Sequence, residues 1–309
     1  MALYAITSYF NPASFQNHLA KYRVFRDHLA VPLITVELSF NGKFELNRSD
    51  ADYLVQISGG AVVWQKERLL NLALEHLPSD CDAVAWIDCD VLFDNPGWVA
   101  DAERQLQDNV MVQLFNRFVD LEPGELAILD SYEHAGRGLI YEIEQQGIDS
   151  LERRTPYGWG HTRREVSPGL AWSIRRDVID ELKFYDAMIM GAADRMILHA
   201  AYGRFSTAPE TVPITDEHLQ HYNKWAHRFY QAVHGRVGYI PHTIYHLWHG
   251  EIPNRGYWSR HERLQELGFD PDQDLRIGKN GAWSWARPRP DIEAYAADYF
   301  PSRKEDGDQ

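Results

Sequence analysis

The stretch from residue 83 to residue 93, Ala-Val-Ala-Trp-Ile-Asp-Cys-Asp-Val-Leu-Phe, constrains the fold of this chain more than any other. It is an apolar run interrupted by two acids, Asp88 and Asp90. A continuous apolar run between polar loops is typical of a strand buried on both faces, as in a mostly parallel sheet covered by helices. Carboxylates at the end of such a strand can bind a hard divalent cation, Mn²⁺ or Mg²⁺, whose coordination shell a diphosphate completes. The same two acids would also fit a solvated turn at a strand end.

The segments before this strand alternate between strand and helix patterns. Short apolar segments predict strands at residues 3–8, 33–38 and 53–57, and apolar residues at helical spacing predict helices at 13–29 and 63–77. The order strand, helix, strand, strand, helix, strand favours an α/β sheet with right-handed crossovers. Ligands of such sheets bind beyond the carboxyl ends of the strands, which is where Asp88 and Asp90 stand.

The rest of the chain continues this alternation without an internal repeat or a low-complexity linker. Further strands are expected at 110–115, 170–174, 237–240 and 243–248, and helices at 96–107, 122–146, 192–202, 218–234 and 255–267. We therefore expect one domain, residues 1–301. The polar residues 302–309 predict a disordered tail.

Composition excludes several other classes of protein. The net charge of −14 argues against a protein that coats nucleic acid nonspecifically, because cationic contacts to phosphates dominate that binding. Cys81 and Cys89 are the only cysteines, which excludes a disulfide scaffold and a cysteine zinc site. The longest apolar runs have the length of strands, and the first residues read as a strand rather than a signal peptide, so a cytoplasmic setting is expected.

Several motifs resemble a known enzyme family in their order and spacing. Residues 64–71, Trp-Gln-Lys-Glu-Arg-Leu-Leu-Asn, followed by 85–91, Ala-Trp-Ile-Asp-Cys-Asp-Val, are similar to the nucleotide-sugar glycosyltransferases of the GT-A fold. Within that fold they resemble the β-1,4-galactosyltransferase type most. Residues 169–176, Gly-Leu-Ala-Trp-Ser-Ile-Arg-Arg, resemble the glycine-led strand that lines the donor sugar. Tyr185-Asp186 and the following Gly191-Ala192-Ala193-Asp194-Arg195 resemble the segment that carries the acceptor-side acid.

The resemblance implies a metal-dependent hexosyltransferase. Such an enzyme would move a sugar from a nucleoside diphosphate, with UDP favoured, to a hydroxyl acceptor, with inversion at the anomeric carbon favoured. Residues 1–115 would form the nucleotide-sugar half and 150–260 the acceptor and catalytic half. Asp90 would bind the metal, and Asp88 would bind either the metal or the donor ribose.

Asp194 inherits the role of catalytic base from the resemblance. An inverting transfer needs a carboxylate within hydrogen-bond reach of the acceptor hydroxyl, opposite the departing diphosphate. The family has Gly-Gly-Glu-Asp where this chain has Gly-Ala-Ala-Asp, so one acid is missing and only Asp194 can serve. A structural alternative is an acid in the first turn of a helix, where the helix dipole stabilises it.

Histidines and arginines near the end of the chain complete the implied donor site. GT-A enzymes commonly add a late histidine to the metal site, and His246 is the expected ligand. His249 is expected near the diphosphate, because two residues of opposite parity cannot both face the metal if the strand continues. Arg255 and Arg260 would neutralise the leaving diphosphate, although a solvated basic helix face would look the same.

The remaining donor residues come from strand ends and from one helix. By resemblance, Lys66, Arg68 and Asn71 contact the nucleobase, the ribose or the metal-side acid, and Gly169 lies in the strand that lines the donor sugar. Thr7 and Tyr9 are expected to contact uridine because they lie at the end of the first strand, although any loop at a strand end would look the same. For Lys66 and Arg68 a surface helix face is the structural alternative.

The sequence says less about the acceptor than about the donor and the metal. Trp159 and Trp172 are expected to contact it, since flat aromatic faces stack on sugar rings, although tryptophans also fill cores. A saccharide is the first expectation. A hydroxymethylated base in DNA is the second, supported by the arginine pairs 153–154 and 163–164 and opposed by the net charge.

Two rival classes of protein remain. A non-catalytic carbohydrate-binding protein would explain the tryptophans without the acids. A nucleotidyltransferase is disfavoured, because no glycine-rich loop follows the first strand.

Overall fold

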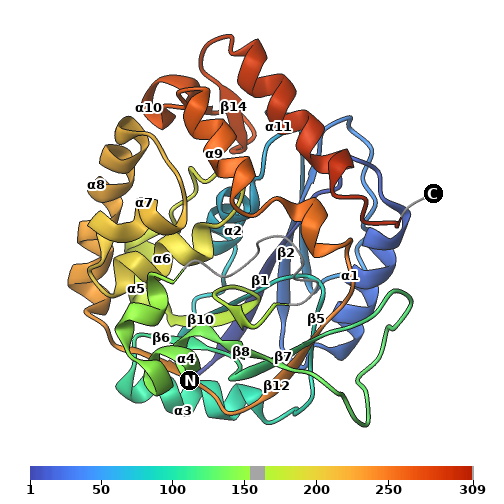
Figure 1. Ribbon diagram of the computed structural model, residues 1–309. Coiled ribbons are helices and arrows are strands. Elements are labelled where there is room, and N and C mark those ends of the chain that lie inside the picture. Colours follow the sequence, from blue (N-terminus) through green and yellow to red (C-terminus); the bar gives the residue numbers. More distant parts are fainter. Residues whose placement is uncertain (154–163, 308–309) are drawn as a thin grey trace.

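A seven-stranded mixed sheet forms the centre of the protein, whose computed structural model describes residues 1–153 and 164–307 (Figure 1). Its strands, in spatial order, are β11 (Val237–Tyr239), β6 (Met111–Gln113), β10 (Ala171–Arg175), β4 (Ala83–Ile87), β1 (Leu3–Tyr9), β2 (Leu33–Ser39) and β3 (Tyr53–Ser58). β10 runs antiparallel to both β4 and β6, and the other pairings are parallel. The prediction of a mostly parallel sheet covered by helices is therefore confirmed, with β10 as the antiparallel strand within it.

Helices cover both faces of this sheet, and strand β4 shows why its sequence is apolar throughout. Ala83, Ala85 and Ile87 pack in a cluster with α1 (Gln16–His28) and α3 (Trp98–Asp108). Val84 and Trp86 face the opposite cluster, to which α2 (Lys66–Leu74), α6 (Ala193–Ala201) and α8 (Asp216–Val233) contribute. A strand buried on both faces needs apolar residues at every position, as the sequence predicted.

Further helices follow the same central sheet along the chain. They are α4 (Leu139–Gln146), α5 (Arg176–Leu182), α7 (Ala208–Thr211), α9 (Ser259–Glu266), α10 (Pro271–Asp274) and α11 (Pro290–Ser302). Among the helices of the described ranges, none has both the length and the apolar composition that crossing a membrane requires.

A five-stranded second sheet lies beside the first and holds part of the site. Its order is β5 (Val91–Phe93), β12 (Thr243–His246), β7 (Arg117–Asp120), β8 (Gly136–Gly138) and β9 (Val166–Ser167). In register, His246 of β12 stands opposite Val91 on one side and Asp120 on the other. β5 follows the Asp88–Asp90 loop directly, so this sheet brings residue 246 to the end of β4. A two-stranded sheet of β13 (Leu275–Ile277) and β14 (Trp283–Trp285) completes the strands.

Two expectations about chain segments are wrong. Residues 122–146 do not form one helix: a non-helical segment that begins with the turn-forming Pro123-Gly124 precedes β8, and only Leu139–Gln146 is helical. In the predicted disordered tail, Arg303 and Glu305 are only 4% and 6% exposed. Asp306 accepts hydrogen bonds from the backbone amides at the start of α1, at 2.8 and 2.9 Å. Figure 1 shows the end of α11 beside α1.

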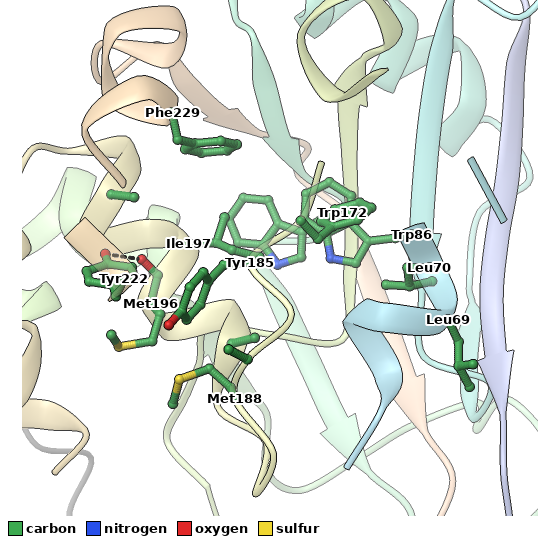
Figure 2. Close-up of a cluster of buried hydrophobic side chains, with 14 of the residues drawn as sticks. Leu69, Leu70, Trp86, Trp172, Tyr185, Met188, Met196, Ile197, Tyr222 and Phe229 are labelled. Atoms are coloured by element: carbon green, nitrogen blue, oxygen red, sulfur yellow. Dashed lines mark hydrogen bonds between the residues drawn. The ribbon is translucent and has the colours of Figure 1, made fainter. Parts of the chain in front are cut away.

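Trp172 belongs to the core rather than to an acceptor site. It is 1% exposed, and its ring stacks on Trp86 with centroids 5.9 Å apart and planes 11° from parallel. Figure 2 shows both rings among the apolar side chains of α6 and α8. The predicted contact between Trp172 and an acceptor is therefore wrong, because β10 and β4 pair these two positions directly.

Removing this ring should destabilise the fold strongly. We expect Trp172→Ala to lower the free energy of unfolding by about 3–5 kcal/mol, because it leaves a cavity between two helix-covered strands. Urea denaturation would measure the change. The control is Trp258→Ala, which removes a partly exposed tryptophan, and it should cost less. Equal losses in the two variants would contradict the structural role of the Trp86–Trp172 stack.

Candidate functional site

Two adjoining cavities open at the carboxyl ends of β1 and β4. The larger has a volume of about 1030 Å³ and is lined by residues of α2, α6, α9 and the segments around residues 168 and 250. The smaller, of about 120 Å³, is lined by the ends of β1 and β4, the start of α1 and the segment 300–305. Trp64, Lys66, Asp88, His249 and Arg303 line both. The cavities are where the sequence placed a ligand site.

Asp90, His246 and His249 form a cluster that fits a divalent metal ion. One carboxylate oxygen and two imidazole nitrogens lie within 4.8 Å of one another. Asp90 Oδ2 is 3.6 Å from His246 Nε2 and 3.7 Å from His249 Nε2, and the two Nε2 atoms are 3.0 Å apart. Asp90 Oδ1 is buried and has no hydrogen-bond partner in the described chain, which leaves it available as a ligand. Carboxylate and imidazole together can bind several divalent metals, so the ligand set does not select one of them.

The expected separation of His246 and His249 onto opposite faces is wrong. β12 ends at His246, and the amide of Leu247 donates to the carbonyl of Asp90 at 2.8 Å. The chain then turns and returns His249 to the same side. The alternation of a strand therefore does not apply to this pair, and both histidines can serve as metal ligands.

The surroundings of the histidines keep the rings neutral, as metal binding requires. His246 Nδ1 donates to Asp120 Oδ1 at 2.8 Å, which directs Nε2 toward Asp90. Burial and the guanidinium of Arg164 lower the pKa of His246, and Arg164 also pairs with Asp120. Burial and Arg255 hold the pKa of His249 well below its usual range. Asp120 thus orients one ligand of the cluster.

Asp88 binds a lysine instead of joining the metal cluster. Its Oδ1 is 2.6 Å from Lys66 Nζ, and Lys66 also reaches Asp194 Oδ2 at 3.2 Å. Burial, partly opposed by Lys66, raises the pKa of Asp88 to about 6. Asp88 is therefore not part of the Asp90–His246–His249 cluster, and its expected role as a metal ligand stays a prediction. Lys66 instead links the end of β4 to the start of α6.

Asp194 projects into the larger cavity from the first turn of α6. The preceding residues Gly191 and Ala192 have φ angles of 82° and 71°, a left-handed turn that starts the helix here. Oδ2 pairs with Lys66, whereas Oδ1 is buried and has no hydrogen-bond partner in the described ranges. A side chain on Gly169 would place its Cβ 2.8 Å from Oδ2. The site therefore leaves one oxygen of Asp194 ready to accept a proton or a hydrogen bond.

Arginines supply positive charge on the opposite side of the cavity. Arg255 and Arg260 are 5% and 6% exposed, and neither has a carboxylate partner in the part of the chain described. The buried Nε of Arg255 has no hydrogen-bond partner there either. Arg303 pairs with Glu305 at 2.6 Å and lies 3.0 Å from His249 Nδ1. Buried cations without a counter-ion are costly, so this side of the cavity is suited to an anionic ligand.

The structure separates the predicted donor contacts into two groups. Thr7, Lys66, Gly169, Arg255 and Arg260 line the cavities. Three other predicted contacts have structural roles, so those predictions are wrong: Tyr9 is buried and donates to Glu45, whereas Arg68 and Asn71 bind Asp186 at 3.0 and 2.9 Å.

Some predicted residues are not described by the structure, and some residues of the site were not predicted. Trp159, Arg154 and Arg163 were predicted and lie outside the described residues. The sequence does not distinguish Asp120, Glu67, Arg303 or Glu305 as site residues: Glu67 lies between two basic residues, and Arg303 and Glu305 belong to a charged run near the end of the chain.

Comparison with known proteins gives distant structural similarities. No family model matches the chain, and no curated protein sequence matches it. A fragment of S. aureus TarS with UDP-GlcNAc is 10% identical with a TM-score of 0.40, over 80% of this chain and 58% of that one. Glucosyl-3-phosphoglycerate synthase from Mycobacterium tuberculosis, with Mn²⁺, UDP-glucose and phosphoglyceric acid, is 14% identical with a TM-score of 0.38, over 67% of this chain and 66% of that one. An active-site mutant of LgtC is 12% identical with a TM-score of 0.35, over 77% of this chain and 72% of that one.

Proposed function

We propose that this protein is a metal-dependent glycosyltransferase of the GT-A type, which moves a sugar from a UDP-sugar to a hydroxyl acceptor. The observation that carries the proposal is the joint placement of two features at the end of β4. One is the Asp90–His246–His249 cluster. The other is Asp194 in the adjoining cavity, whose Oδ1 has no hydrogen-bond partner in the described part of the chain. The motif order that resembles the β-1,4-galactosyltransferase type supports the same reaction.

Each part of the site has a role in this reaction. Asp90, His246 and His249 would hold Mn²⁺ or Mg²⁺, which supplies charge stabilisation to the diphosphate. Arg255 and Arg260, which have no carboxylate partner among residues 1–153 and 164–307, would face the developing negative charge of the leaving group. Thr7 and Asp88 line the smaller cavity, where the nucleoside would enter.

Asp194 Oδ1 removes the proton of the acceptor hydroxyl as its oxygen forms a bond to the anomeric carbon. The bond between that carbon and the diphosphate oxygen breaks, and UDP leaves with the electron pair. The attack comes from the side opposite the diphosphate, so the configuration inverts. Ion pairing to Lys66 through Oδ2 holds the carboxylate in place and leaves Oδ1 for the proton.

A saccharide is the acceptor that we favour, and the 1030 Å³ cavity has room for sugar rings. A hydroxymethylated DNA base is the second candidate, and a non-catalytic carbohydrate-binding protein is the alternative from another class.

Thermal shift with a panel of UDP-sugars, with and without Mn²⁺, tests the proposal. We expect one UDP-sugar to raise the melting temperature only when Mn²⁺ is present, and EDTA to reverse the effect. Sugar binding that is indifferent to Mn²⁺ and EDTA would favour the carbohydrate-binding alternative. No response to any UDP-sugar would contradict the proposed function.

Gly169→Ala should reduce activity without a comparable loss of stability. The new Cβ would meet Asp194 Oδ2 at 2.8 Å, and the end of a side chain moves more readily than backbone. We expect transfer to fall by roughly 10–100-fold, because a displacement of about 1 Å at a reacting group has effects of this order. Steady-state kinetics and thermal melts would measure the two effects. Gly147→Ala is the opposite control: no atom lies within 4 Å of its Cβ, but its φ of 88° strains a residue that has a side chain, so this variant should lose stability and keep its activity. Full activity in Gly169→Ala would contradict the assigned position of Asp194.

A further inference from the structure

Glu67 is a buried acid that the proposed mechanism does not use. It is the second residue of α2, is 3% exposed, and lines the larger cavity together with Asp194. Its carboxyl group accepts a hydrogen bond from its own backbone amide, and no side chain of the described residues binds it. Its neighbour Lys66 is held by Asp88 and Asp194. A carboxyl group that is buried at a cavity and is bound by no other residue is available to a ligand.

Helix geometry alone does not explain this acid. An acid in the first turn of a helix gains roughly 0.3–1 kcal/mol from the helix dipole, and up to about 2 kcal/mol when partly buried. Burial of an unpaired carboxylate costs several kcal/mol, which exceeds that gain. The neutral carboxyl is therefore the favoured form, and burial raises the pKa of Glu67 to about 8. A neutral carboxyl group can donate one hydrogen bond and accept another.

The position of Glu67 assigns it to the acceptor side of the cavities. It lines only the larger cavity, whereas Thr7 and Asp90 line only the smaller one, at the strand ends. Asp88 and Asp194 line the same cavity, and Asp194 Oδ1 has no hydrogen-bond partner among the described residues. A saccharide offers neighbouring hydroxyl groups. One can be deprotonated at Asp194 while the next exchanges hydrogen bonds with a neutral carboxyl group.

We propose that Glu67 is an acceptor-binding residue, whose neutral carboxyl group binds the hydroxyl adjacent to the one that Asp194 activates. The inference rests on the proposed function and specifies its acceptor as a vicinal diol of a saccharide. Glu67 positions this acceptor and takes no part in the proton transfer or in breaking the bond to the diphosphate.

The charges around Glu67 give the proposal a pH dependence. Lys66 on α2, Asp88 after β4 and Asp194 on α6 act on its carboxyl group, and Arg195 and Arg260 line the same cavity. Ionisation of Glu67 would place a third carboxylate beside Asp88 and Asp194, with Lys66 as their shared cation. Because the folded pKa lies above that of the unfolded chain, Glu67 lowers folding stability as pH rises from about 4.5 to about 8. Glu67→Gln should therefore melt at a higher temperature than the wild type at pH 9.

The test compares Glu67→Gln and Glu67→Ala with the control Glu75→Gln, an exposed acid at the end of the same helix. Calorimetry measures UDP binding in Mn²⁺, and transfer is measured from UDP-glucose, UDP-galactose and UDP-N-acetylglucosamine to a panel of methyl glycosides. We expect all three variants to bind UDP as the wild type does. Glu67→Ala should raise the acceptor KM by roughly 10–100-fold, the effect of losing one to two hydrogen bonds. Glu67→Gln should stay within about threefold at pH 7.

The pH profile separates binding from a merely structural role. Wild-type transfer should decline above about pH 8, whereas Glu67→Gln should keep its acceptor KM there. An unchanged acceptor KM in Glu67→Ala overturns the inference, and so does weaker UDP binding in that variant. A protein that binds UDP with Mn²⁺ but glycosylates no methyl glycoside also overturns it. If the wild type fails to bind UDP at all, the proposed function itself is wrong.

Discussion

Asp90→Asn is expected to abolish the Mn²⁺ dependence of nucleotide binding. Asp90 supplies the only carboxylate of the cluster with His246 and His249, and its Oδ1 has no hydrogen-bond partner in the described residues. An amide is a neutral and weaker ligand. We expect the affinity for Mn²⁺ to fall by at least about 100-fold, because the loss of even an outer-shell partner costs roughly 10–100-fold. Calorimetric titration with Mn²⁺, alone and with UDP, would measure the change.

Two further variants make this result specific. Asp94→Asn replaces an exposed acid just beyond β5 and should leave Mn²⁺ binding unchanged. Asp120→Asn removes the carboxylate that orients His246 and should give an intermediate loss, roughly 10–100-fold. Wild-type Mn²⁺ affinity in Asp90→Asn would show that the two acids after β4 form a solvated turn and not a metal site.

The central sheet was predictable because a strand that is buried on both faces has an apolar residue at every position. Residues 83–87 are apolar at every position, and the structure divides them between two apolar clusters. The placement of a ligand site at the end of this strand follows from the general behaviour of α/β sheets. The direction of β10 was not predictable in this way, since its apolar residues fit either direction equally well.

The residues of the site were predictable only where a motif fixed both side chain and element. Asp90 and Asp194 come to the cavities because each follows a recognisable strand end or helix start. His249 depends on a turn after β12 that the strand pattern does not indicate. The contact of Asp88 with Lys66 was not predictable from the motif, because Lys66 lies on α2, 22 residues earlier in the sequence.

Several aromatic and charged side chains that were expected at the surface or at a ligand are buried against other parts of the protein. Trp172 was expected to stack on a sugar ring because it is aromatic, but its ring packs on Trp86. Arg68 lies on the same helix as Lys66, yet a different face of α2 directs it to Asp186. The charged segment after residue 302 looked disordered, but Arg303 and Glu305 neutralise each other and pack beside the metal cluster. Each of these outcomes depends on a partner that lies far away in the sequence.

Asp194→Asn should reduce sugar transfer severely while leaving the donor side intact. Asparagine keeps the size of the side chain and an oxygen that can accept from Lys66, but it cannot take up the acceptor proton. We expect kcat to fall by roughly 10²–10⁴-fold, the usual contribution of a general base. UDP binding in Mn²⁺ should remain at the wild-type level, because Asp194 does not belong to the metal cluster.

The alternative for Asp194, an acid that only stabilises the start of a helix, predicts a different pattern. Asp216 is an exposed acid in the first turn of α8, so Asp216→Asn measures the dipole contribution by itself. If Asp194 had only that role, both variants would lose about 0.3–1 kcal/mol of stability and keep their activity. A large loss of kcat in Asp194→Asn alone, with normal UDP binding, requires a role in chemistry. The anomeric configuration of the product, read by NMR, then separates the two chemical roles: inversion agrees with a base, and retention would leave Asp194 as a residue that orients the substrate.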